Sequence, residues 1–377
     1  MKKLILAMLA LGVALVVGPV AADDAADAIA ACDRLTASPF DPGRRADPLN
    51  LGEIDVEAAL AACSQALTVA PDDGRLHFQL GRVYEASQQF DLAWNAYQQG
   101  AARDLPVSIR AVARMAYLGL GRAPDIKTAL AQYRKAADLG LLTAQWEYGI
   151  ALLSDQVTSK DYATAIEYFE IAAFGGAPEA MRELGGLYER GDGVPRDDAK
   201  AEQWYLKAAN AGHVPTMVDL GLFYAGDKGR EPDYGKARQW FERAMDAGSP
   251  DAPRDLAALY EKGRGVAADD AKAIALYRTA IDRGDVESLH SLAVRLFETN
   301  GPERSSRESA FWYYQSILHE EKPSFDEVTG DPGHWDEEFR RTLQELMTKD
   351  GFYKGPISGE FDDATLAALR VALGPRN

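Results

Sequence analysis

Cysteine and histidine are scarce in this sequence of 377 residues, which contains two cysteines and five histidines. The histidines form neither a His-Glu-x-x-His nor a His-x-His pattern, so the sequence shows no zinc-binding arrangement. It also lacks the Gly-x-Ser-x-Gly turn of a nucleophilic serine and any Ser-x-x-Lys pair. We therefore predict no catalytic residue, no metal site and no cofactor in this chain.

Long hydrophobic runs are absent except at the N-terminus. Lys2 and Lys3 precede an apolar run over 4–17, and the small residues of 20–22 are suited to a cleavage site. The run is short for a membrane span, and acidic residues follow it at once. We predict that residues 1–22 are a signal peptide cleaved near Ala22, that the mature chain is periplasmic in a Gram-negative bacterium, and that it has no membrane span.

Positive charge is in deficit, with 41 Lys and Arg against 58 Asp and Glu and a formal net charge of −17. Loss of Lys2 and Lys3 with the signal peptide takes this charge from −17 to −19. Such a balance argues against nucleic acid and anionic membranes as partners. It is compatible with basic proteins.

An unbroken register of 36 residues runs from Asp125 to His319. It is marked by regularly spaced glycines, aspartates, alanines and aromatic residues. The glycines are Gly140, Gly176, Gly212, Gly248 and Gly284, and the aspartates are Asp125, Asp161, Asp197, Asp233 and Asp269. A period of this length is typical of stacked supersecondary units that present surface to partners.

Each unit is predicted to be a pair of helices. The aspartates precede runs with apolar residues three or four apart, where a carboxylate can cap a helix start. The glycines follow those runs, where a left-handed residue can end a helix. Small residues such as Gly185 and Ala201 allow close approach of two helices, and the aromatic residues are predicted to fill the core.

The best-preserved unit begins at Ala180 and contains Ala-Met-Arg-Glu-Leu-Gly-Gly-Leu-Tyr, the turn Gly-Asp-Gly-Val-Pro and Ala-Lys-Ala-Glu-Gln-Trp-Tyr-Leu-Lys-Ala-Ala. This pattern resembles the Sel1-like repeat, a relative of the tetratricopeptide repeat. Asp227 and Ala257 replace expected glycines in two other units. The resemblance implies an all-α fold, a right-handed α-solenoid of stacked antiparallel helix pairs, here followed by a small C-terminal helical domain.

Residues outside the register suggest further segments. Cys32 and Cys63 are an even pair in an oxidising compartment, so we predict a disulfide between them that contributes roughly 3 to 4 kcal/mol. The alternative, a lipid anchor at Cys32, is disfavoured by the acidic residues before it. We expect a disulfide-stapled, tetratricopeptide-like cap over 23–110, the solenoid over 111–319 and an acidic linker over 320–334.

The tail, 335–377, contains Leu343-Gln344 and Gly-Phe-Tyr-Lys-Gly-Pro-Ile-Ser-Gly-Glu-Phe from Gly351. It is similar to the peptidoglycan-binding-like domain of wall enzymes, although Ser358 stands where that family usually has Asp. The resemblance implies wall contacts by Tyr353, Ser358 and Phe361. The alternative is a helical cap on the last repeat.

In solenoids of this type the first helix of each unit lines the concave face. Its outward positions vary between units, as those of a partner-specific groove would. The candidate partner-binding residues are Trp146, Ile150, Arg182, Glu189, Val218, Leu222, Arg254 and His290. The alternative is that some of them pack between helices.

The function hypothesis is a non-catalytic periplasmic scaffold or adaptor that binds an envelope protein through this concave face. Its tail would attach it to peptidoglycan. The alternative is a peptidoglycan-binding or glycan-binding accessory protein, or a wall-associated enzyme.

Overall fold

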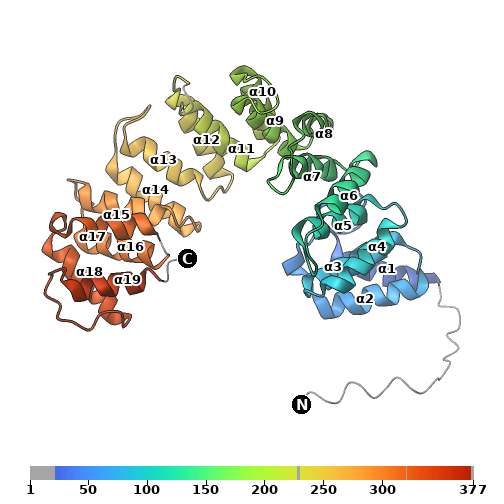
Figure 1. Cartoon of the computed structure of the whole chain (residues 1–377), viewed down its shortest axis with the longest axis horizontal. Coiled ribbons are helices and arrows are strands. Elements are labelled where there is room, and N and C mark those ends of the chain that lie inside the picture. The colour runs from blue at the N-terminus through green and yellow to red at the C-terminus, as the bar shows by residue number, and fades with distance from the viewer. Residues whose placement is uncertain (1–21, 227–229, 320, 375–377) are drawn as a thin grey trace, which may run out of the picture. The chain divides into compact units, whose positions relative to one another are not determined.

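The described residues, 22–226, 230–319 and 321–374, form helices and connecting turns in a computed structural model of the chain (Figure 1). The predicted signal peptide lies outside these residues, apart from Ala22. The chain divides within helix α9 into two compact units. The N-terminal unit ends at Leu184 and also contains Asp192–Val194, and the C-terminal unit holds Gly185–Gly191 and the chain from Pro195.

Consecutive helices pack side by side in the N-terminal unit. The helices are α1 (Ala22–Thr36), α2 (Val56–Val69), α3 (Gly74–Ala86), α4 (Phe90–Ala101), α5 (Pro106–Leu118), α6 (Ile126–Asp138), α7 (Leu142–Leu153) and α8 (Tyr162–Phe174), with a short 3-10 turn, η1, at Leu51–Glu53. The expected boundary at residue 110 falls inside α5.

The C-terminal unit continues the same alternation of paired helices. Its helices are α10 (Asp198–Asn210), α11 (Val214–Tyr224), α12 (Tyr234–Asp246), α13 (Ala252–Glu261), α14 (Asp270–Asp282), α15 (Ser288–Glu298), α16 (Ser306–Leu318), α17 (Lys322–Gly330), α18 (Glu337–Lys349) and α19 (Asp363–Ala372), with η2 at Pro332–His334. Helix α9 (Pro178–Arg190) spans the division. The predicted all-α class of stacked helix pairs is confirmed.

The recurring aspartates begin the second helix of each pair. The carboxylate of Asp197 accepts a hydrogen bond from the Lys200 amide at 3.0 Å, which satisfies one of the free amides of the first turn. The other four aspartates of the register do the same, at distances of 2.9 to 3.1 Å. Ser305 caps α16 in the same way. The predicted caps are confirmed.

The recurring glycines follow those helices in left-handed conformation. Gly212 has φ of +89°, and its four counterparts lie between +86° and +95°. A side chain at this φ crowds the following carbonyl, whereas glycine has no Cβ and tolerates it.

A second glycine position allows helices to touch. A Cβ at Gly185 would lie 2.5 Å from the Tyr205 ring, and Gly149 meets Phe169 at the same distance. Gly185 and Tyr205 stand in the two helices of one pair, and Tyr205 is buried. The ring therefore packs directly on backbone, as predicted for the small and aromatic positions.

The tail shares a core with the last helix pair. Trp335, Phe339 and Leu343 are fully or almost fully buried together with Tyr313 and Ile317. The stacked rings of Trp335 and Phe339 lie 4.2 Å apart between centroids, and both contact Tyr313 edge-on. Residues 335–374 are therefore packed against α16.

The segment expected to be a linker, 320–334, differs from that prediction because it contains α17. Pro323 stands in the first turn, where its missing amide is not needed. Phe325 and Val328, three residues apart, are buried on one helix face. Among the described residues, no helix has the length and apolar character needed to cross a membrane.

Candidate functional site

The predicted partner-binding residues differ in their surroundings. Trp146 and Ile150 on α7 are half-buried, and Val218 on α11 packs against the core of the C-terminal unit. Leu222, one turn after Val218, is 44% exposed. Of these four apolar candidates, Leu222 is the one whose side chain is open to solvent.

Glu189 is buried and forms a polar triad within the C-terminal unit. Its carboxylate accepts a hydrogen bond from the Tyr205 hydroxyl at 3.0 Å and pairs with Arg230 at 2.6 Å. Burial, and then the negative charge of Glu189, raises the pKa of Tyr205 far above its usual value. Glu189 was expected at an outward position, but its side chain is buried and joins helices inside the stack.

Similar triads occur elsewhere in the chain. Glu261 accepts from Tyr277 at 2.7 Å and lies 3.7 Å from Arg295. In the N-terminal unit, Tyr97 donates to Glu85 at 2.8 Å and Arg114 pairs with the same carboxylate. The sequence signal is a glutamate followed 16 residues later by tyrosine, which Glu189 and Glu261 share.

The arginine candidates are partly buried. Arg182 lies on α9, and Arg254 on α13 pairs with Asp285 at 2.9 Å and with Glu287. Asp255 beside it is largely buried among acidic groups. Desolvation raises the pKa of Asp255 to about 6, and Asp251, Asp285 and Glu287 add to the effect while Arg254 opposes it.

His290 on α15 faces α17, which lies in the segment predicted to be a linker. Its Nδ1 lies 2.7 Å from the Ser324 hydroxyl of α17, and its Nε2 lies 3.4 Å from Glu327. The ring also packs edge-on against Tyr313 at 5.5 Å. These contacts place His290 in the packing of α15, α16 and α17.

The predicted wall-contact residues of the tail also differ in their exposure to solvent. Tyr353 is 3% exposed and donates to the Pro356 carbonyl at 3.0 Å, whereas Ser358 is exposed. Phe361 packs partly buried against the core. The buried amide of Gln344 holds the intervening loop by donating to the Glu360 carbonyl and accepting from the Gly359 amide, both at 2.8 Å.

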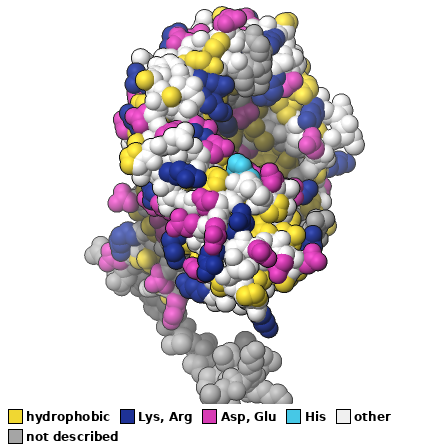
Figure 2. Space-filling model, turned by 90° about the vertical axis from the view of Figure 1, so that its left-hand side faces the viewer, with side chains coloured by type: hydrophobic (Ala, Val, Ile, Leu, Met, Phe, Trp, Pro, Cys, Tyr) yellow, Lys and Arg dark blue, Asp and Glu magenta, His cyan; other side chains and the backbone are white. Residues whose placement is uncertain are grey.

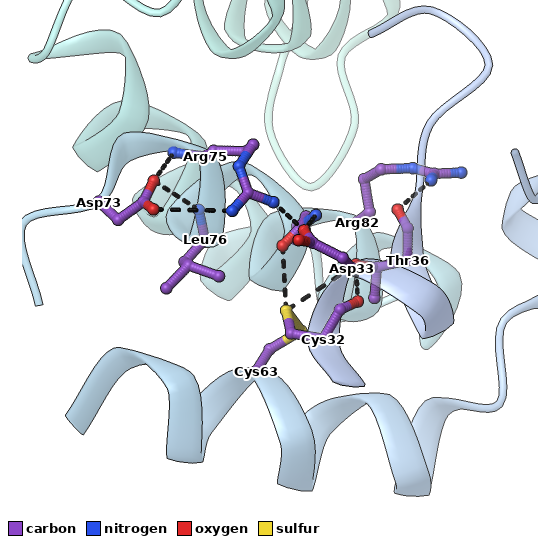
Figure 3. Close-up of a disulfide and its surroundings, with 9 residues drawn as sticks. Cys32, Asp33, Thr36, Cys63, Asp73, Arg75, Leu76 and Arg82 are labelled. Atoms are coloured by element: carbon purple, nitrogen blue, oxygen red, sulfur yellow. Dashed lines mark hydrogen bonds and ion pairs between the residues drawn. A yellow bond between two sulfur atoms is a disulfide. The ribbon is translucent and has the colours of Figure 1, made fainter. Parts of the chain in front are cut away.

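Cys32 and Cys63 form the predicted disulfide, which joins α1 to α2 (Figure 3). Both cysteines are fully buried, and their Cα atoms are 4.7 Å apart. Asp33, next in sequence, pairs with Arg75 of α3 and accepts from Gln79 at 2.6 Å. The disulfide and this ion pair tie α1 to the two helices that follow it.

Charged side chains of both signs are interspersed over the face of the molecule seen in Figure 2, with hydrophobic side chains between them. Among the residues described, no group of three or more His, Cys, Asp or Glu side chains is placed to hold a metal ion.

The architecture defines an α-solenoid class of protein, built from stacked helix pairs. The sequence profile of the Sel1 repeat matches the chain at 106–141, 142–173, 178–213, 215–249 and 250–285. The chain therefore contains five Sel1 repeats between residues 106 and 285. The first matched repeat pairs α5 with α6, and the α15–α16 pair continues the 36-residue register beyond the last match.

Two solved structures are similar over most of the chain. A protective antigen present in uropathogenic Escherichia coli strains, with an SLR fold, has a TM-score of 0.57 and 25% identity over 78% of this chain. This chain covers 64% of that antigen, less than two thirds of its length. A Sel1 repeat protein from Oxalobacter formigenes has a TM-score of 0.55 and 29% identity over 63% of this chain and 97% of its own. No curated protein matches the sequence.

Proposed function

We propose that this chain is a non-catalytic periplasmic scaffold that binds an envelope protein through the first helices of its Sel1 repeats. Stacked repeats support this proposal because such units commonly present a continuous surface to protein partners. The disulfide supports an exported chain, since disulfides persist in oxidising compartments. The acidic surplus favours a basic partner.

Leu222 is the observation that carries the proposal. It lies on α11, the first helix of its repeat, and is 44% exposed, whereas Val218, one turn earlier, is partly buried against the core. An exposed leucine beside a packed helix face can be buried by an apolar group of a partner, which removes apolar surface from water and favours binding.

A matched pair of variants tests this surface. Ile171 is also 44% exposed but lies on α8, the second helix of its repeat. Immobilised wild-type chain is used to capture proteins from an envelope extract, with identification by mass spectrometry. We expect Leu222→Glu to lose a protein that wild type and Ile171→Glu both retain, with equal melting temperatures for all three. Retention of every captured protein by Leu222→Glu would show that α11 does not hold the partner.

For the tail, the contacts favour a capping role over glycan binding. The side chain of Tyr353 is buried in the core, and the amide of Gln344 is already hydrogen-bonded to the loop that it holds. Attachment to peptidoglycan is tested by sedimentation of the full chain with isolated cell wall, comparing wild type with Ser358→Trp. Pelleting that Ser358→Trp abolishes would assign the tail to the wall. Absence of pelleting in wild type would leave the tail as a cap.

A further inference from the structure

Three arginine side chains surround an open hollow at the end of α1 and in the loop that follows it, within the N-terminal unit. The hollow has a volume of about 860 Å³. Its lining residues are Arg34, Pro42, Arg44, Arg45, Ala46, Asp47 and Leu49. The three arginines are exposed, although the formal net charge of the chain is −17. Positive charge is thus concentrated at a place that the overall composition does not predict.

The three guanidinium groups have no acidic partners. No carboxylate among the described residues lies at ion-pair distance from Arg34, Arg44 or Arg45. In the same part of the chain their side chains make one hydrogen bond, from the Arg44 guanidinium to the Asp41 carbonyl at 3.5 Å. A hydrogen bond of that length is weak. The donors of all three groups are therefore open to a ligand.

Acidic residues around the hollow do not cancel this charge. Asp47 is the one carboxylate among the lining residues, so the lining carries two surplus positive charges. Asp33, which precedes Arg34, is paired with Arg75 of α3. Asp27 lies two helical turns earlier on α1, about 10 Å away along the helix axis. Neither carboxylate is available to pair with Arg34.

Two further acids lie beside the hollow. Asp41 is buried and acts electrostatically on the buried Arg82, which is a cation at neutral pH, so these two charges offset each other. Glu53 accepts a hydrogen bond from the Asn50 amide at the start of η1. Counting Glu53 against the lining as well still leaves one positive charge. The surplus at the hollow is therefore one to two charges.

The loop is held by contacts at both of its ends. The buried guanidinium of Arg82 donates to the carbonyls of Thr36 and Leu49 (Figure 3 shows the contact with Thr36). The Leu49 amide donates to the Ala37 carbonyl at 2.9 Å, which closes the loop at its base. A backbone that is already fixed lowers the cost of ordering the site when a ligand binds.

A phosphate group suits three guanidinium groups better than a carboxylate does. Its tetrahedral oxygens can accept hydrogen bonds from several directions, whereas a carboxylate offers two oxygens in one plane. A phosphate monoester carries about −1.5 to −2 charges at neutral pH, which is close to the surplus at the hollow. The aliphatic lining residues, Pro42, Ala46 and Leu49, can contact the rest of an ester.

We propose that this hollow binds the phosphate group of a soluble ester or of a lipid headgroup through Arg34, Arg44 and Arg45. The phosphate oxygens accept hydrogen bonds from the guanidinium groups, and the body of the ligand extends into solvent. This site is separate from Leu222 and goes beyond the proposed function. Loss of one site therefore leaves the other measurable.

The test measures binding of inorganic phosphate to the full chain by isothermal titration calorimetry at constant ionic strength and pH 7.5. Malonate is the comparison, because it carries a similar charge on two carboxylates. We expect phosphate to bind at least about fivefold more tightly than malonate. Sedimentation with vesicles of phosphatidylglycerol and phosphatidylcholine, compared with phosphatidylcholine alone, tests the lipid source.

Paired variants locate the binding. Arg44→Gln with Arg45→Gln should weaken phosphate binding by about tenfold or more and leave the melting temperature unchanged, because both side chains are exposed. Arg134→Gln with Lys135→Gln is the control, since it removes the same charge from exposed positions of α6 in the same unit. The control should bind phosphate within about twofold of wild type.

The outcomes separate the sources of the phosphate. Phosphate binding without pelleting would assign the site to a soluble ester. Pelleting that requires phosphatidylglycerol and is lost in the Arg44 and Arg45 variant would assign it to a lipid headgroup. Equal binding of malonate, equal losses in the two double variants, or no binding of either free phosphate or vesicles would overturn the proposal.

Discussion

The hydroxyl of Tyr205 and the carboxylate of Glu189 form a buried hydrogen bond of 3.0 Å between the two helices of one repeat. Arg230 pairs with the same carboxylate from the chain segment that follows α11. A tyrosine, an acid and an arginine from three elements thus meet at one point. The strength of this contact bears on the stability of the repeat.

Replacing Glu189 should therefore be costly. Glu189→Ala leaves the largely buried guanidinium of Arg230 without its nearest carboxylate, and we expect a loss of about 3 kcal/mol in the free energy of unfolding. Tyr205→Phe removes one hydrogen bond and should cost about 1 kcal/mol. Urea unfolding followed by circular dichroism measures both. Arg307→Ala, which breaks an exposed pair with Glu345, is the control and should change stability by less than about 0.5 kcal/mol. A Glu189→Ala variant as stable as the control would contradict the role of the triad.

The raised pKa of Asp255 predicts that the stability of the folded chain depends on pH. Its pKa is raised to about 6 in the folded chain because burial and nearby acids disfavour the carboxylate. A raised folded pKa means that the folded chain holds this proton more tightly than the unfolded chain. The stability that the proton confers is complete below about pH 4 and is lost as the pH rises toward 6. Asp255→Asn should therefore raise the melting temperature at pH 7 and have a smaller effect at pH 4. An effect that is equal at both pH values would show that Asp255 titrates normally.

The left-handed conformation of the recurring glycines predicts that the loss of stability on replacing a glycine depends on its position. Gly212→Val places a β-branched residue at φ of +89° and should cost about 1 to 2 kcal/mol, or more. Gly235→Ala is the matched control, because Gly235 lies in the first turn of α12 without a positive φ, where alanine favours a helix over glycine. Denaturation midpoints should move in opposite directions. A midpoint for Gly212→Val at or above that of wild type would remove the conformational requirement.

The disulfide should stabilise the N-terminal unit. The paired cysteines are 31 residues apart, and closing such a loop contributes about 3 to 4 kcal/mol in the chain-entropy description. Cys32→Ser with Cys63→Ser should lower the melting temperature, and reductant should lower that of wild type to a similar value. Reductant should leave the double variant unchanged, which controls for its other effects. Equal melting of wild type with and without reductant would contradict this contribution.

Local features of the repeat were predictable from the sequence because their chemistry lies within a few residues. Asp197 and Gly212 each act on their own helix end, so a carboxylate before an apolar run and a glycine after it suffice. The helix pairing followed from the 36-residue register in the same way.

Side chains that depend on another element were harder to place. Glu189 was predicted to face outward from its helix. Its side chain is buried because Arg230 and Tyr205, from other elements, pack on it. His290 is covered by α17, whose acidic, proline- and glycine-containing sequence suggested a linker. The spacing of Phe325 and Val328, three residues apart, was the available sign of a helix. A pattern of two residues is too short to predict one. A pocket of about 350 Å³ in the N-terminal unit, lined in part by Phe40 and Arg82, has no counterpart in the repeat pattern.

The burial of Trp335 and Phe339 against Tyr313 affects how the stack of repeats could be lengthened. An α-helical repeat stack can in principle be lengthened wherever its terminal pair leaves an apolar flank, whether by gene duplication or by docking of a second molecule end to end. Here the tail already occupies the flank next to α16. A further helix pair could pack on these residues of α16 only if 335–374 were displaced.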